Sequence, residues 1–155
     1  MVRVLVVALA CGVLASVPGC GGGGGSSSSL VGNWIFEDTT NGVGAAFDAQ
    51  ADGTYTAAIL QVTGASSANA QIEKGRYTAT ASTVTFTPTQ WSCSGPDPAT
   101  TSNYSFSGGD LILSDASTTV SFMRNNAPVT STVILTNGCF DQNGNFTAQP
   151  LGPAQ

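Results

Sequence analysis

The chain of 155 residues contains no histidine and few charged side chains. Without histidine, a serine–histidine triad and a histidine-bearing zinc site are excluded, and the usual general base near neutral pH is missing. Lysine and arginine number only four against nine acidic residues, so the chain cannot neutralise a row of phosphates, and we expect no nucleic-acid partner. No nucleophile stands beside a base, and Asp48 and Asp52 are interpreted as turn formers rather than as a carboxylate site. We therefore expect no enzyme, no cofactor and no metal.

The amino terminus is predicted to be an export signal spanning residues 1–19. Arg3 gives it a positive start, and residues 4–17 form an apolar stretch of about fourteen residues, too short for a permanent membrane helix. The stretch ends in Ser-Val-Pro-Gly-Cys, which resembles the lipobox of bacterial lipoproteins, although Pro18 departs from the usual small residue. The resemblance implies cleavage before Cys20 and its acylation with chains such as palmitate. A plain secretory signal cut nearby is the alternative, and Cys11 is a poorer lipidation site.

A flexible tether is predicted after the anchor. Residues 20–29 are Cys20 followed by five glycines and four serines, a composition that behaves as random coil. Two or three acyl chains would hold such a protein in a membrane, with membrane lipid as its partner. Because Gly21 replaces the aspartate that commonly retains lipoproteins at an inner membrane, the resemblance implies an outer-membrane lipoprotein facing the periplasm or the cell surface.

From Leu30 onward the sequence is typical of β-strands. Threonine, valine and aromatic residues alternate with polar ones, and Asp-Gly and Asn-Gly pairs mark tight turns between short runs. The pattern predicts an all-β domain of antiparallel strands, either a barrel or a β-sandwich. We expect strands near 31–37, 43–50, 54–62, 70–80, 83–88, 102–107, 110–114, 118–124 and 131–136, and a hairpin at 138–148.

A resemblance at the start of this domain favours closure into a barrel. Residues 30–34 (LVGNW) look like the Gly-x-Trp opening of lipocalin-like, calycin-type barrels, and residues 104–111 and 119–124 resemble the closing hairpin and last strand of bacterial lipocalin-like lipoproteins. The resemblance covers about 30–124 and implies a small up-and-down β-barrel. It also implies that Trp34 stacks on Arg124 at the closed end. The simpler interpretation is a core tryptophan and a solvated arginine.

Residues 125–155 extend beyond the expected barrel and are predicted to form an extra C-terminal hairpin and a loose tail. With Cys11 cleaved and Cys20 acylated, Cys93 and Cys139 remain, and outside the cytoplasm they should form a disulfide. This bond would fasten the extension to the irregular loop 89–101. The sequence DQNGN at 141–145 begins like a calcium loop but lacks the later glutamate, so a hairpin turn is preferred.

Two functions remain open for the domain. The first is a membrane-anchored binding module whose barrel takes a small apolar or amphiphilic ligand. The second is a structural or protein-interaction lipoprotein of the cell envelope without a cavity, since aromatic side chains can also fill a narrow barrel. Ligand or partner contacts are expected from Trp91, Tyr55, Tyr77 and Tyr104.

Overall fold

The computed structural model describes residues 29–94, 97–128, 131 and 133–154, and within them it contains eleven β-strands and no α-helix. The predicted signal, Cys20 and nearly all of the tether lie outside these residues. The strands are β1 (Gly32–Asp38), β2 (Val43–Ala49), β3 (Thr54–Gly64), β4 (Ser67–Ala79), β5 (Thr83–Trp91), β6 (Thr100–Ser107), β7 (Asp110–Ser114), β8 (Thr119–Asn125), β9 (Ile134–Phe140), β10 (Phe146–Ala148) and β11 (Gly152–Pro153).

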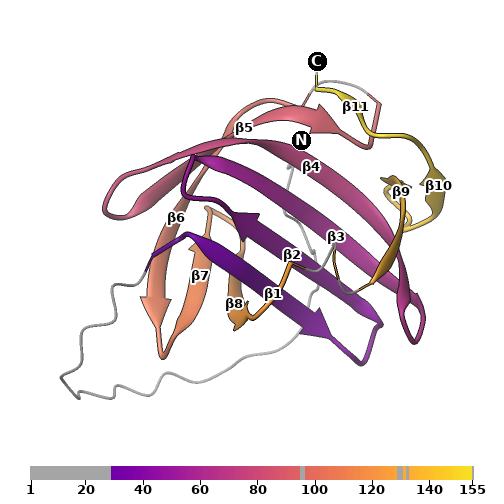
Figure 1. Ribbon diagram of the computed structural model, residues 1–155, viewed down its shortest axis with the longest axis horizontal. Coiled ribbons are helices and arrows are strands. Elements are labelled where there is room, and N and C mark those ends of the chain that lie inside the picture. The colour runs from indigo at the N-terminus through magenta and orange to yellow at the C-terminus, as the bar shows by residue number, and fades with distance from the viewer. Residues whose placement is uncertain (1–28, 95–96, 129–130, 132, 155) are drawn as a thin grey trace.

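Strands β1 to β8 form a closed antiparallel barrel (Figure 1). Each strand pairs with the next in sequence, and β8 returns to pair with β1. The all-β barrel predicted from the alternating pattern is therefore confirmed, and the β-sandwich alternative is wrong. Turn chemistry explains the succession of hairpins: Gly53, Gly108 and Gly109 have positive φ values of 80°, 63° and 99°, which only glycine adopts without strain.

One end of the barrel is closed by Trp34, which is 1% exposed. Its ring lies against Phe106, with ring centroids 5.8 Å apart, and its Nε1–H donates to the carbonyl of Leu30 at 2.9 Å. The guanidinium carbon of Arg124 lies 4.8 Å from the centre of the indole, and its Nη2 donates to the carbonyl of Val31 at 2.8 Å. This end of the barrel is thus filled by side chains and capped by a cation.

The barrel has apolar side chains on both faces of β2, β3 and β4. Phe47 and its alternate neighbours point into the barrel, whereas Ala46, Ala70 and Ile72 belong to a second cluster on the outer face. The extension covers that outer cluster through Val133, Leu135 and Leu151. Burying this second face explains why the chain continues past β8.

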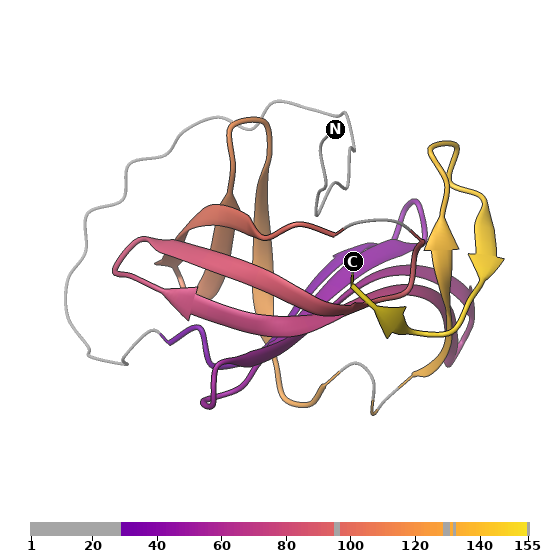
Figure 2. The same cartoon turned by 90° about the horizontal axis from the view of Figure 1, so that it is seen from above.

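The extension is more ordered than the sequence predicted. The expected strand at 131–136 and hairpin at 138–148 are instead one hairpin of β9 and β10, which stands beside the barrel in Figure 2. Gly138 lies inside β9, where the Phe146 ring occupies the space that a Cβ would need. The expectation of a loose tail was also wrong: Gly152 and Pro153 pair with β5, and the amide of Ala154 donates to the carbonyl of Thr89 at 3.1 Å.

Strand β4 is the longest in the fold, and two strands share one of its edges. Its second half pairs with β5 from Glu73 to Ala79, whereas Ser67 to Ala70 pair in parallel with β9. A register shift lies at Gly75, where an added Cβ would meet the Thr87 carbonyl oxygen at 2.2 Å. From Glu73 toward Ser67, β5 ends and β9 takes its place beside β4, so the C-terminal extension completes the barrel wall there.

Candidate functional site

The end of the barrel opposite Trp34 opens into a cavity of about 1290 Å³. Its rim is formed by the β5–β6 loop, the β7–β8 turn at 115–118 and the tip of the β9–β10 hairpin at 140–144. Its inner wall is apolar and includes Ala57, Ile59, Leu113 and Val120. The aromatic side chains therefore do not fill the whole barrel, and a small organic molecule has room inside.

Three aromatic rings lie together on the inner wall of this cavity. The Phe86 centroid is 5.4 Å from that of Phe47 and 5.1 Å from that of Tyr55, and the Phe47 and Tyr55 centroids are 6.1 Å apart. Each ring comes from a different strand, β2, β3 or β5, at an inward position of the alternating pattern. They form a rigid apolar cluster in which Phe47 and Tyr55 are 2% and 3% exposed and Phe86 is partly buried.

A buried acidic group adjoins these rings. The Tyr55 hydroxyl donates a hydrogen bond to Oε1 of Glu73 on β4, and the Glu73 carboxyl also hydrogen bonds to the side chain of Asp97 in the β5–β6 loop. Burial raises the pKa of Glu73 to about 7; the Tyr55 hydrogen bond lowers it and the charge of Asp97 raises it. Burial, with the adjacent Glu73 charge, raises the pKa of Tyr55. Tyr55, Glu73 and Asp97, here called the acid cluster, thus hold a proton near neutral pH.

Two further carboxylates lie on the rim, and both organise turns. Asp115 accepts from the amides of Ser117 and Thr118, each at 2.8 Å. Asp141 accepts from the amide and side chain of Asn145 at 2.9 and 2.8 Å. Hydrogen bonds hold the pKa of each carboxyl below its usual value. In the described residues no three metal-ligating side chains cluster, and 141–145 form the hairpin turn.

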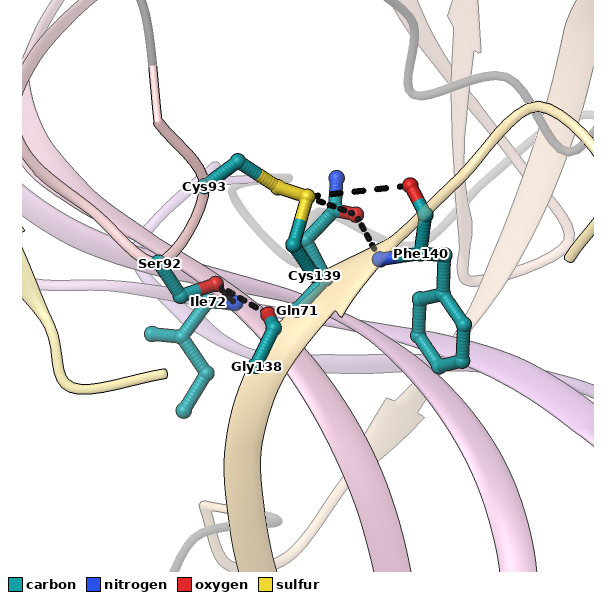
Figure 3. The surroundings of a disulfide bond; sticks show 7 residues. All are labelled: Gln71, Ile72, Ser92, Cys93, Gly138, Cys139 and Phe140. Carbon is teal, nitrogen blue, oxygen red and sulfur yellow. Dashed lines mark hydrogen bonds between the residues drawn. A yellow bond between two sulfur atoms is a disulfide. The ribbon is translucent and has the colours of Figure 1, made fainter. Parts of the chain in front are cut away.

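The disulfide between Cys93 and Cys139 is confirmed, and it borders the cavity. The two Cα atoms are 4.9 Å apart, and the bond joins the β5–β6 loop to β9 (Figure 3). Beside it, the buried Ser92 hydroxyl accepts from the Ile72 amide at 2.8 Å and donates to the Gly138 carbonyl at 2.7 Å. The disulfide and the Ser92 hydroxyl together hold β4, β5 and β9 at their junction.

The sequence-derived contact residues separate into two groups. Trp91 and Tyr55 line the cavity, and Trp91 pairs with Glu73 in the sheet. Tyr77 and Tyr104 pack against the core of the barrel, and their hydroxyls donate to the carbonyls of Gln50 and Thr80 at 2.8 and 2.7 Å. Those carbonyls lie at the closed end of the barrel, and the described lining of the cavity includes neither tyrosine.

Asp48 is not the turn former that the sequence analysis expected. It lies within β2, points to the outer face between Asn33 and Thr56, and is 6% exposed. Among the described residues its Oδ1 has no hydrogen-bond partner, and burial raises its pKa to about 6. Asp52 does form a turn, since its carboxylate accepts from the amide and hydroxyl of Thr54 at 2.9 and 2.6 Å.

Sequence reasoning missed Glu73 and Asp97 as site residues. A signal for Glu73 was present, because it lies four residues from Tyr77, which was assigned to a strand face by its alternation, and residues two or four apart share a face. A charged residue on the inward face of a barrel strand marks a site. Asp97 carried no such signal, since its position depends on the path of an irregular loop.

No family model, curated protein or solved structure matches the chain. In the described part of the chain, no helix has the length and apolarity needed to cross a membrane.

Proposed function

We propose that the protein is a binding module that holds a small amphiphilic molecule in the open end of its barrel. The observation that carries the proposal is the cavity of about 1290 Å³, which combines a largely apolar wall with the carboxyl groups of the acid cluster. Ligand sites in proteins combine a mostly apolar lining with a few polar groups that set orientation. A barrel filled by its own side chains would lack this space.

The resemblance to lipocalin-like lipoproteins supports this proposal through the geometry of the closed end. Gly32, Trp34 and Arg124 lie together there, with the arginine over the indole. This arrangement is the one that the resemblance implies for barrels closed at one end and open at the other. We further propose that Cys20 is acylated and that the module is tethered to the outer membrane of the cell envelope through the glycine and serine linker.

The expected affinity follows from the apolar wall. Burying a methylene contributes about 0.8 kcal/mol, so an eight-carbon chain gains about 6 kcal/mol. Association costs about 4 kcal/mol or more in lost freedom. The remaining gain of about 2 kcal/mol corresponds to a Kd of tens of millimolar. A well-placed polar group that contributes about 2–3 kcal/mol brings the expected Kd to about a millimolar or slightly below.

Binding is tested with N-phenyl-1-naphthylamine, an uncharged apolar probe whose fluorescence rises in apolar surroundings. Two tryptophan substitutions on β3 provide a matched pair: Ile59→Trp fills the cavity, whereas Val62, which is 60% exposed, lies outside it. The wild type and Val62→Trp should bind the probe saturably, and Ile59→Trp should bind at least about tenfold more weakly. Equal binding by the two variants, or none by the wild type, would contradict the proposal and favour a structural role.

A further inference from the structure

The charges around the cavity are of one sign. Among the described residues that line it are four carboxyl groups and no lysine or arginine. The basic side chains of the domain lie elsewhere: Lys74 and Arg76 are exposed on β4, outside the cavity lining, and Arg124 caps the closed end. The cavity therefore attracts cations and repels anions, and its low-dielectric walls strengthen that selection. The four lining carboxyls are those of Glu73, Asp97, Asp115 and Asp141.

The acid cluster offers hydrogen-bond acceptors deep in the cavity. Glu73 receives one hydrogen bond from Tyr55 and shares another with Asp97, which is itself only 7% exposed. The described cavity lining contains no lysine or arginine, and a positive charge beside Glu73 would favour its ionised form. A ligand bearing a positive charge and N–H donors would form charge-assisted hydrogen bonds with these carboxyl oxygens.

The aromatic rings give a second and independent indication. Phe47, Tyr55 and Phe86 come within 6.1 Å of one another between centroids, and all three line the cavity beside Glu73. Phe47 and Tyr55 are 2% and 3% exposed, so a ligand in the cavity would meet mainly the partly buried ring of Phe86. An organic cation is attracted to an aromatic ring, and the attraction grows when water is excluded. A bare metal ion would find only two adjacent carboxyls and would leave the apolar wall unused, and the described residues contain no metal-ligating group of three.

The geometry points to an amphiphilic organic amine as the ligand of this cavity, with its ammonium group at the Glu73–Asp97 pair and its apolar part against Phe86 and Ile59. This inference rests on the proposed function, since it names the ligand class of the same cavity.

Three eight-carbon probes separate the ligand class from simple apolar binding. Octylamine is a cation at about pH 8, octanol is neutral and octanoate is an anion, and all three share one chain. Isothermal titration calorimetry of the full-length protein at this pH should give octylamine a Kd at least about tenfold below that of octanol. Octanoate should bind more weakly than octanol.

A pair of glutamate substitutions locates the charge. Glu73→Gln should weaken octylamine at least about tenfold and leave octanol within about twofold, because only the cation uses the carboxylate. Glu37→Gln makes the same change in net charge on β1, outside the cavity lining, and should alter neither. If Glu73→Gln no longer binds octanol, its fold is damaged, and Asp97→Asn is then used with the same expectation.

Each outcome is decisive. Equal affinity for the three probes would leave the proposed function standing and overturn the amine inference, as would equal losses in Glu73→Gln and Glu37→Gln. If none of the three probes binds to the wild type, both the amine inference and the proposed function fail.

Discussion

The guanidinium of Arg124 occupies the space in which a side chain at Gly32 would begin. An added Cβ would lie 2.6 Å from Nη2 and 3.1 Å from Cζ of Arg124, and the φ of Gly32 is +148°. Glycine is therefore required at this position so that the arginine can reach both the Trp34 ring and the Val31 carbonyl. The Gly-x-Trp pattern and the distant arginine form one structural unit.

Gly32→Ala should lower the free energy of unfolding by about 2–3 kcal/mol, because it adds both backbone strain and displacement of Arg124. Gly42→Ala is the control, since Gly42 also has a positive φ of +64° but its added Cβ meets nothing within 4 Å. It should cost only about 1 kcal/mol. Urea unfolding measures both variants, and equal losses would show that displacement of Arg124 contributes nothing.

Stability should fall as pH rises from about 4 to 7. Asp48 has a pKa of about 6 in the folded state, above the 3.8 expected in the unfolded state. The folded state therefore binds the Asp48 proton more tightly, and the stability that this proton contributes is lost as the pH rises through about 6. Glu73, raised to about 7, acts in the same direction. Asp48→Asn should be about 1–3 kcal/mol more stable than the wild type near pH 8 and equal to it near pH 4.

Urea unfolding at several pH values checks this, with Asp52→Asn as the control. Hydrogen bonds from Thr54 lower the pKa of Asp52, so this variant should instead be less stable than the wild type near neutral pH. A wild type that becomes more stable between pH 4 and 7 would refute the buried-carboxyl account.

Removing the disulfide should lower the free energy of unfolding but leave the barrel folded. The bond links positions 46 residues apart, and the chain-entropy estimate for such a loop is about 4 kcal/mol. The double variant Cys93→Ser, Cys139→Ser should lose up to this amount in urea unfolding while its far-ultraviolet circular dichroism keeps the β spectrum, since β1 to β8 close without the bond. A spectrum of an unfolded chain would contradict this expectation.

Ser92→Ala should cost about 2–4 kcal/mol. The substitution removes the hydroxyl partner of both the Ile72 amide and the Gly138 carbonyl at the junction of β4 and β9, where Ser92 is 1% exposed. Ser94→Ala, at an exposed position two residues along, should change stability by less than about 0.5 kcal/mol. Thermal unfolding of the two variants compares them directly, and similar melting temperatures would argue against the hydroxyl bridge.

The barrel was predictable because its strands obey a period of two and are joined by short turns. Cys93 and Cys139 were paired by elimination, and Trp34 was placed near Arg124 by resemblance; the structure brings both pairs together. The failures arose where a second layer intervenes. Asp48 was assigned to a turn by its residue type, but it is buried within β2. The outer-face cluster that contains Ala46 of the same strand packs against Val133 and Leu135, more than eighty positions away, and no local pattern reveals this layer.

The acid cluster escaped prediction for a related reason. Tyr55 was chosen for its ring, but its hydroxyl acquires a role only because β3 and β4 pair in the register that sets Ala57 opposite Glu73. Asp97 reaches them from a loop whose path depends on the neighbouring disulfide. Long-range register and loop path are set by the whole fold, and local patterns do not encode them.

The docking of β9 on β4 also affects how copies of the protein meet. Were Ser67–Ala70 uncovered, they would offer unpaired backbone groups onto which another polypeptide could add a strand. With β9 and β10 in place, the sheet instead ends in β10, a strand of three residues, at one edge and in β11, a strand of two residues, at the other. Such brief margins give a neighbouring molecule little to align with, so crowded copies should remain separate rather than assemble into fibrils.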